Sequence, residues 1–154
     1  MNEIKNGKYK GNKIIVCDPK WTTMVKYADI WLQPRMGTDV ALLNGMIHII
    51  IKENLIDKEF IKKRVDGGMK AYKKLRDVVD KYTPEETERI TGVPREKFTE
   101  AARIYAKSST AMIATGMGLS QQQVGTHMVF SLINMMLITG QIGKERAGID
   151  PPRG

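Results

Sequence analysis

Three short apolar runs divide the chain, and each is followed by a turn and then by a helical pattern. The runs cover residues 13–16, 30–33 and 110–114, and the first is rich in β-branched side chains. Continuous apolar runs of this length are typical of buried strands in parallel sheets. Repeated strand–turn–helix order places helices over the faces of such a sheet. The pattern predicts a helix-rich, three-layer α/β domain with a small, mostly parallel sheet.

The segments between these strands contain residues that are typical of helix starts and helix ends. The strongest start signal is Thr83-Pro84-Glu85-Glu86, a capping box with proline at the first helical position. Asp57 can cap another helix, and Thr38 or Asp39 a third. Gly92 and Gly140 are placed to end helices. We predict helices over 22–28, 38–53, 57–65, 70–79, 84–92 and 94–107, and one long apolar helix between the turn at 116–118 and residue 139.

The chain is the size of one domain. Residues 1–12 are polar and lysine-rich, which predicts a linker, and 13–140 carry the domain pattern. Glycine and proline in 141–154 predict a loop that leads out of the domain. No apolar stretch approaches the roughly 18–20 residues of a membrane span, so direct membrane insertion is not expected.

Charge narrows the choice of ligand. Lys and Arg number 25 against 17 Asp and Glu, giving a net charge of +8, which suits an anion. The cations form no run of five or six, and aromatic residues are only 6%, so a compact pyrophosphate ranks above RNA or DNA. A solvated basic surface and a standalone nucleotide- or RNA-binding module stay open as alternatives. The lone Cys17 excludes an internal disulfide and a self-contained zinc or iron–sulfur site.

The turns after the three strands carry the candidate chemistry. Ligands bind outside the carboxyl ends of strands in open α/β sheets, so the three turns are expected to form one site. Together they offer a carboxylate for ribose or guanine donors, glycines for close backbone approach, cations for phosphate and an amide for a base edge. These turns are 17–20, 33–39 and 115–121.

Each candidate residue also has a simpler interpretation. Asp18 before Pro19 could merely end a strand, and Arg35 could be a solvated cation. Gln121 could simply open the last helix, and it stands where the dinucleotide fingerprint needs a third glycine. Other residues are expected to serve packing: His48 as a core histidine, Cys17 as a small buried residue, and Met46, Met112, Met135 and Met136 as core filler.

Long ordered segments of the chain are similar to the molybdopterin oxidoreductases of the dimethyl sulfoxide reductase type, especially the catalytic subunits of formate dehydrogenases. The similarity spans nearly everything after Gly11. The segments that carry it are Ile14–Lys20, Tyr27–Asp29, Gly37–Met46, Asp57–Phe60, Tyr82–Glu85, Ile90–Pro94, Gly116–Gly118, Thr139–Gly143 and Ala147–Gly154.

The resemblance implies a large enzyme that carries molybdenum or tungsten on two molybdopterin guanine dinucleotides, with a 4Fe-4S cluster held by a part outside this chain. It implies that Arg153 orients the substrate formate, since a guanidinium suits a carboxylate. Lys20 replaces an arginine common in the family, and lysine lacks the planar two-pronged geometry. The implied cofactor-binding residues are Cys17, Asp18 and Lys20 in the first loop, Pro34, Arg35, Gly37 and Asp39 in the second, and Gly116, Met117, Gly118 and Gln121 in the third.

From this resemblance we expect an enzyme part that is inactive alone. Its expected partners are the remaining domains of the same subunit and an iron–sulfur electron-transfer subunit. A reductase of polysulfide, thiosulfate, nitrate or arsenate is the alternative within the family. We expect a cytoplasmic enzyme, with an exported one as the other possibility.

Overall fold

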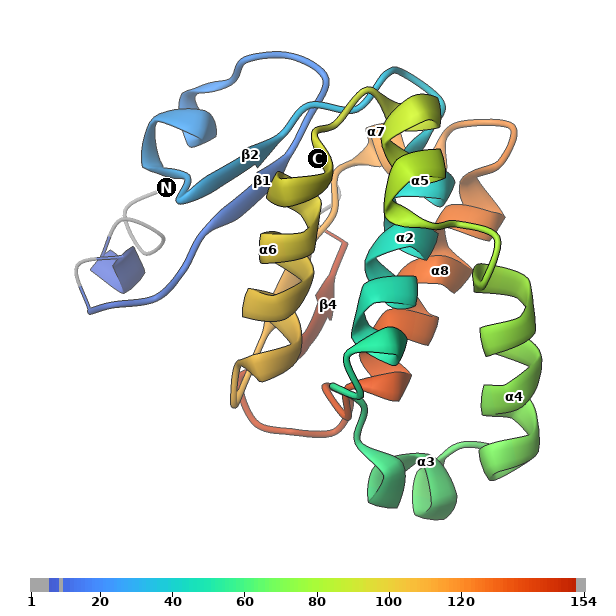
Figure 1. The fold of residues 1–154 in the computed structure, drawn as a ribbon. Coiled ribbons are helices and arrows are strands. Elements are labelled where there is room, and N and C mark those ends of the chain that lie inside the picture. Colours follow the sequence, from blue (N-terminus) through green and yellow to red (C-terminus); the bar gives the residue numbers. More distant parts are fainter. Residues whose placement is uncertain (1–5, 9, 152–154) are drawn as a thin grey trace.

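Two short parallel sheets lie along one side of a helical body in the computed structural model, which describes residues 6–8 and 10–151 (Figure 1). Strand β1 (Ile15–Cys17) pairs with β2 (Ile30–Leu32), and β3 (Met112–Ala114) pairs with β4 (Gly148–Asp150), both in parallel. The predicted helix-rich α/β class and the parallel pairing are confirmed. Where one sheet was expected, hydrogen bonding divides the described strands into two.

Strand β4 lies in the segment predicted as a loop, so that prediction is wrong for residues 148–150. Its only large apolar residue is Ile149, which is too little for a strand signal. Its order comes from its partner, because Gly148 N donates to Ala111 O at 3.1 Å and Thr115 N donates to Asp150 O at 2.9 Å. Gly148 has a φ of +139°, which suits glycine.

The predicted helix boundaries are largely confirmed. Asp57 Oδ1 accepts from Phe60 N at 2.9 Å, and Thr83 Oγ1 accepts from Glu86 N at 3.3 Å. Thr38 precedes its helix without a side-chain cap. The helical elements are η1 (Thr23–Tyr27), α2 (Asp39–Lys52), α3 (Lys58–Arg64), α4 (Gly68–Val79), α5 (Pro84–Thr91), α6 (Arg95–Lys107), α7 (Met117–Ser120) and α8 (Gly125–Ile138).

The long helix expected after the third strand is broken into α7 and α8. Residues 121–124 form a turn between them. A Cβ on Gly125 would collide with the carbonyl of Ser120, so the chain can double back there only at a glycine. Three consecutive glutamines and a valine gave no turn signal of the usual kind.

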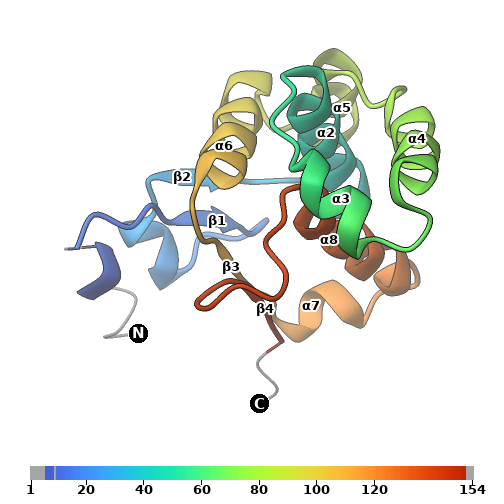
Figure 2. The same ribbon diagram turned by 90° about the horizontal axis from the view of Figure 1, so that it is seen from below.

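Helix α2 lies at the centre of the core and packs against α4, α5, α6 and α8 (Figure 2). Ile47 and Ile50 on α2 and Phe98 on α6 are fully buried. His48 is buried with Nδ1 3.1 Å from Val79 O, as expected of a core histidine. The core-filler prediction is confirmed for Met46, Met135 and Met136.

Met112 was predicted to be core filler and is instead 64% exposed. Ile113, the next residue of β3, packs on the core, and successive strand residues point to opposite faces. Met112 therefore lies on the face of β3 that the described helices leave uncovered.

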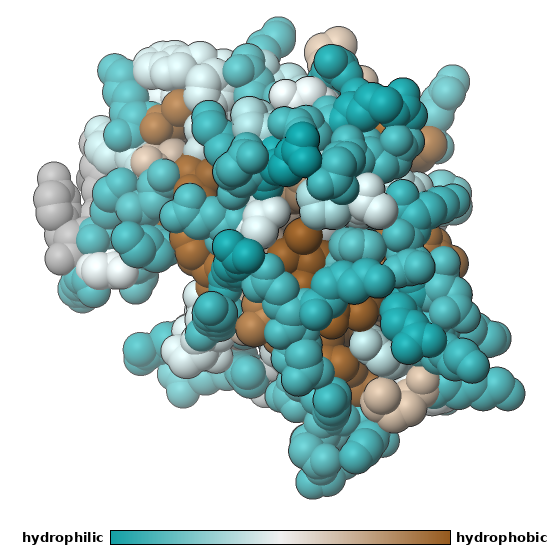
Figure 3. All heavy atoms as spheres, in the orientation of Figure 1, coloured by the Kyte–Doolittle hydropathy of each residue, from teal (hydrophilic) through white to brown (hydrophobic). Residues whose placement is uncertain are grey.

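The helical side of the molecule is mainly hydrophilic, and apolar side chains reach the surface in a strip at its middle (Figure 3). No helix among the described residues is long and apolar enough to cross a bilayer.

Candidate functional site

The loops that follow β1, β2 and β3 all lie at the upper end of the molecule in Figure 1. Parallel pairing explains this for the first two loops, since β1 and β2 end at the same edge of one sheet, whereas β3 pairs with β4 in a second sheet. The structure thus brings the three predicted loops to one end of the domain, although their strands belong to two sheets.

The first two loops are joined by hydrogen bonds. Trp31 Nε1 donates to Asp18 O at 3.0 Å, and Gln33 Nε2 donates to Pro19 O at 3.0 Å. Trp31 and Gln33 were not singled out from the sequence. Their spacing could have identified them, because alternate residues of a strand point to the same side. The turn at Asp18 is also fixed internally, since its Oδ1 accepts from Lys20 N at 2.8 Å.

Cys17 is exposed at the end of β1, so the prediction of a buried residue is wrong. It is the last strand residue and points to the side opposite Val16. Protein atoms around the sulfur, and then the carboxylates of Asp39 and Asp18, raise the pKa of the Cys17 thiol to about 12, although the residue keeps an exposed surface. It is therefore a neutral thiol near neutral pH, and Asp39 of the second loop acts on it electrostatically.

Arg35 faces the end of helix α5. Its Nη1 donates to Arg89 O at 2.8 Å and to Ile90 O at 3.2 Å, and its backbone N donates to Thr91 O at 2.8 Å. The Arg35 side chain stays exposed while it bonds α5, and its predicted contact with phosphate stays a prediction. No pattern near residue 35 signals them, because the partners lie more than fifty positions away.

Gly37 and Asp39 complete the second loop. Gly37 has a φ of +79°, which a residue with a side chain rarely adopts. Thr38 Oγ1 donates to Arg35 O at 2.6 Å, and Asp39 opens the fourteen-residue helix α2. A carboxylate is favoured at this end of a helix by the helix dipole. Pro34 is buried, whereas Lys20 across the site is exposed.

The third loop is open to solvent at two glycines. A Cβ placed on Gly116 or Gly118 would meet no atom within 4 Å. Met117 is 51% exposed, and Gln121 Nε2 lies 3.5 Å from its sulfur. Gln121 follows the last residue of α7 and does not open α8.

Two further predictions concern the substrate and a metal ion. Arg153, proposed to orient the substrate, lies outside the described residues and stays a prediction. Within the residues that the structure describes, no group of three His, Cys, Asp or Glu side chains could hold a metal ion.

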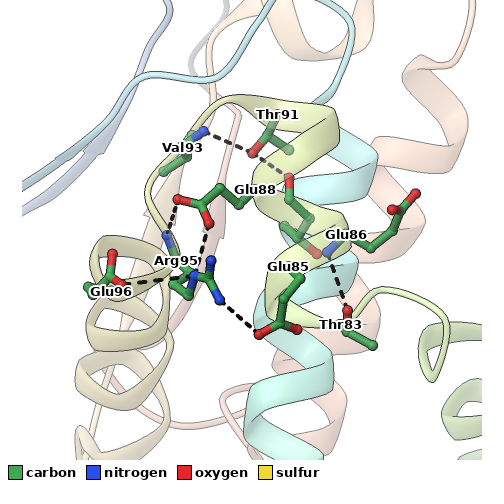
Figure 4. A network of polar contacts seen from close by, with 9 residues as sticks. Thr83, Glu85, Glu86, Glu88, Thr91, Val93, Arg95 and Glu96 are labelled. Carbon is green, nitrogen blue, oxygen red and sulfur yellow. Dashed lines mark hydrogen bonds and ion pairs between the residues drawn. The ribbon is translucent and has the colours of Figure 1, made fainter.

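An ion-pair network fixes the end of α5 on which the second loop rests (Figure 4). Arg95 Nε lies 2.9 Å from Glu88 Oε2, and Arg95 Nη1 lies 2.9 Å from Glu85 Oε1. Thr91 Oγ1 donates to Thr87 O at 2.7 Å and accepts from Val93 N at 3.1 Å. The turn between α5 and α6 is therefore held by both side-chain and backbone bonds.

Comparison with known proteins gives consistent matches. The molybdopterin oxidoreductase family matches residues 1–151. The F420-dependent formate dehydrogenase subunit alpha of Methanocaldococcus jannaschii is 49% identical over 98% of this chain and 22% of its own length. Formate dehydrogenase H of Escherichia coli is 42% identical over 99% of the chain and 21% of its own length. The chain thus spans about a fifth of the length of these relatives.

A solved structure shares the fold. Acetylene hydratase from Pelobacter acetylenicus superposes with a TM-score of 0.86 at 31% identity, over 94% of this chain and 19% of that one.

Proposed function

This chain belongs to the molybdopterin oxidoreductase family, and from that premise we propose that it is the cofactor-holding α/β domain of a formate dehydrogenase. In this proposal the three loops bind the guanosine and pyrophosphate end of one molybdopterin guanine dinucleotide. When bound, the pterin carries molybdenum or tungsten, which supplies the redox chemistry. The residues of this chain bind and orient the nucleotide.

Gly116 and Gly118 carry the proposal. Neither adopts a positive φ, and neither is in contact with other parts of the chain where a side chain would stand. Gly118 also lies in the single turn of α7, where its φ does not require glycine. The fold gives no reason for glycine at either position. Close approach of another molecule to the backbone does give one.

Other groups at this end fit a guanine nucleotide. The half-buried Asp18 carboxylate can accept from ribose hydroxyls or guanine N–H groups, and its turn is preset by the bond to Lys20 N. The exposed Gln121 amide offers both a donor and acceptors for a base edge. Lys20 provides a cation for phosphate, although without the two-pronged geometry of arginine.

The test replaces each glycine by alanine in the full-length subunit. Because nothing lies within 4 Å, we expect Gly116→Ala and Gly118→Ala to leave the thermal stability of the cofactor-free protein unchanged or slightly raised. We expect the metal and the GMP released by hydrolysis to fall severalfold in the purified enzyme. Ser120→Ala in the same short helix is the matched control. Full cofactor content in both glycine variants would contradict the proposal.

Formate as substrate rests on the relatives and on Arg153. We propose that the Arg153 guanidinium pairs with the formate carboxylate beside the metal. An Arg153→Lys enzyme should then show a higher KM for formate with normal cofactor content. We also propose that a 4Fe-4S cluster and an iron–sulfur subunit would carry the electrons away. We propose further that the enzyme is cytoplasmic. Residues 1–154 alone are expected to have no activity.

The likeness to acetylene hydratase supports a second candidate, a member of the family with another substrate. One fold can serve several chemistries, so the domain by itself does not select formate. Formate-dependent dye reduction by the full-length enzyme, run beside acetylene hydration and reduction of nitrate, thiosulfate, polysulfide and arsenate, decides between them. Absence of formate oxidation with any of the other activities present favours the second candidate.

A further inference from the structure

We propose that Arg35 is a positioning residue, which fastens the second loop to the end of α5 and so sets the places of Gly37 and Asp39, and that it does not bind phosphate itself. The proposal deepens the proposed function, on which it rests for the identity of the ligand. The second loop is residues 33–39, as above.

Arg35 holds the second loop through three groups: its side chain, its backbone N–H and its backbone carbonyl. The side chain donates from Nη1 to Arg89 O and Ile90 O, and the backbone N donates to Thr91 O. The backbone carbonyl of Arg35 accepts from Thr38 Oγ1 at 2.6 Å and from Thr38 N at 3.2 Å. One residue thus connects the end of α5 to the residue that precedes α2.

The electrostatics of a helix end favour this position for the guanidinium. The last carbonyls of α5 lack partners within the helix and carry the negative end of its dipole. A cation bonded to two of them satisfies these carbonyls and has part of its charge balanced there. The same nitrogen is then directed toward α5 and not toward a phosphate.

Gly92 gives the Arg35 guanidinium room to lie against the end of α5. It ends α5 with a φ of +74°, and a Cβ at this position would lie 3.3 Å from both Cζ and Nε of Arg35 and 3.5 Å from Nη2. The guanidinium lies over the glycine, where a side chain would crowd it. Thr91 and Gly92 lie outside the three loops, yet they help to position the second loop through their contacts with Arg35.

The end of α5 that Arg35 contacts is itself packed and bonded, so we expect it to hold the second loop in one position. Thr87 and Thr91 are fully buried, and Arg95 joins α5 to α6 through Glu85 and Glu88 (Figure 4). A loop fastened to such a base spends more of its time in one geometry. Ligand affinity falls in proportion to any loss of that population.

The experiment uses the full-length, cofactor-free subunit, with Arg35→Gln and Arg35→Lys compared with wild type. Arg89→Gln is the matched control, because it removes one positive charge from the same helix end and keeps the carbonyl that Arg35 uses. Amide hydrogen exchange of residues 35–40 without any ligand reports the loop. Titration with GDP at two salt concentrations reports binding.

We expect both Arg35 variants to exchange faster in the loop and to bind GDP about tenfold more weakly, since neither Gln nor Lys has the planar guanidinium that bonds both carbonyls. The salt dependence of GDP binding should stay that of wild type, and Arg89→Gln should match wild type in both readouts. If Arg35 bound the phosphate directly, Arg35→Lys would bind GDP better than Arg35→Gln, because lysine keeps the positive charge. Wild-type loop exchange with weaker GDP binding in Arg35→Gln, restored by Arg35→Lys, would overturn the proposal.

Gly92→Ala provides an independent perturbation from the α5 side. It changes no charge and no atom of the second loop, yet it crowds the guanidinium and strains the helix end. We expect the same faster loop exchange, and unchanged exchange would count against a positioning role. If wild type fails to bind GDP while the exchange results hold, the proposed ligand is wrong and the positioning of the loop stands.

Discussion

The crossing of α2 and α5 at Gly45 and Thr87 gives a sharp prediction for Gly45→Ala. A Cβ at Gly45 would lie 2.6 Å from Thr87 Cγ2 and 2.9 Å from Thr87 Cβ, well inside van der Waals contact. Thr87 is fully buried, and its Oγ1 donates to Tyr82 O at 3.3 Å. Its β-branched side chain cannot rotate away without losing that bond. The helices must therefore separate.

Two opposing effects set the size of the change. Alanine in place of a mid-helix glycine gains about 1 kcal/mol of helix propensity. An added carbon in a packed core lowers the free energy of unfolding by about 1–3 kcal/mol. We expect a value near the upper end here, because the new Cβ would meet several atoms of the β-branched Thr87 side chain. We expect Gly45→Ala to lower the free energy of unfolding by about 1–2 kcal/mol. Urea unfolding followed by circular dichroism measures it.

Gly118→Ala is the matched control, since the same substitution in α7 meets nothing within 4 Å and should not destabilise. A double-mutant cycle with Thr87→Ala tests the cause. The combined variant should be more stable than the sum of the two single changes by about 1 kcal/mol or more. Strict additivity, or a Gly45→Ala protein as stable as wild type, would refute the steric reasoning.

Three further predictions concern the strands and the first loop. Asp29 Oδ2 accepts from Ile14 N at 2.8 Å, and that bond lowers the pKa of the carboxyl. Asp29→Asn should therefore cost about 1 kcal/mol at neutral pH. In urea unfolding the difference should shrink as the pH falls below about 4, where the unfolded carboxyl takes up a proton before the folded one does, and should be lost below the lowered pKa of the folded carboxyl. Gln141→Leu should cost about 2–3 kcal/mol in the same assay, because its buried amide bonds two backbone groups at the entry to β3; a neutral effect would contradict this. Cys17 should react slowly with iodoacetamide at pH 8 and faster as the pH rises toward 12, and Asp39→Asn should speed the reaction at pH 8; a rate that levels off near pH 8.5 would contradict the raised pKa.

Local signals predicted most of the elements. Thr83 and Asp57 accept the bonds expected of caps, and Gly92 and Gly140 end their helices with positive φ. These features depend on neighbouring residues, so a single sequence contains them. The shared position of the first two loops also followed, because β1 and β2 are parallel neighbours, whereas the third loop reaches the same end from a second sheet.

Features set by distant partners were missed. Strand β4 is ordered by β3, and the turn between α7 and α8 depends on the close approach of Gly125 to Ser120. Arg35 was predicted as a site residue because it lies in the second loop, whereas the carbonyls that it bonds lie on α5. Met112 and Cys17 have ordinary core side chains but sit on strand faces that the described chain leaves uncovered. Neither residue type nor periodicity says which face of a short strand is covered.

The convergence of the three loops on one nucleotide is tested most directly by hydrogen exchange in the full-length enzyme, compared with and without its bound cofactor. We predict that amides in 18–21, 35–39 and 116–121 all become protected together in the cofactor-bound enzyme. Protection confined to other segments, or absent from any one of the three, would contradict the assignment of this domain to the guanosine end of the cofactor.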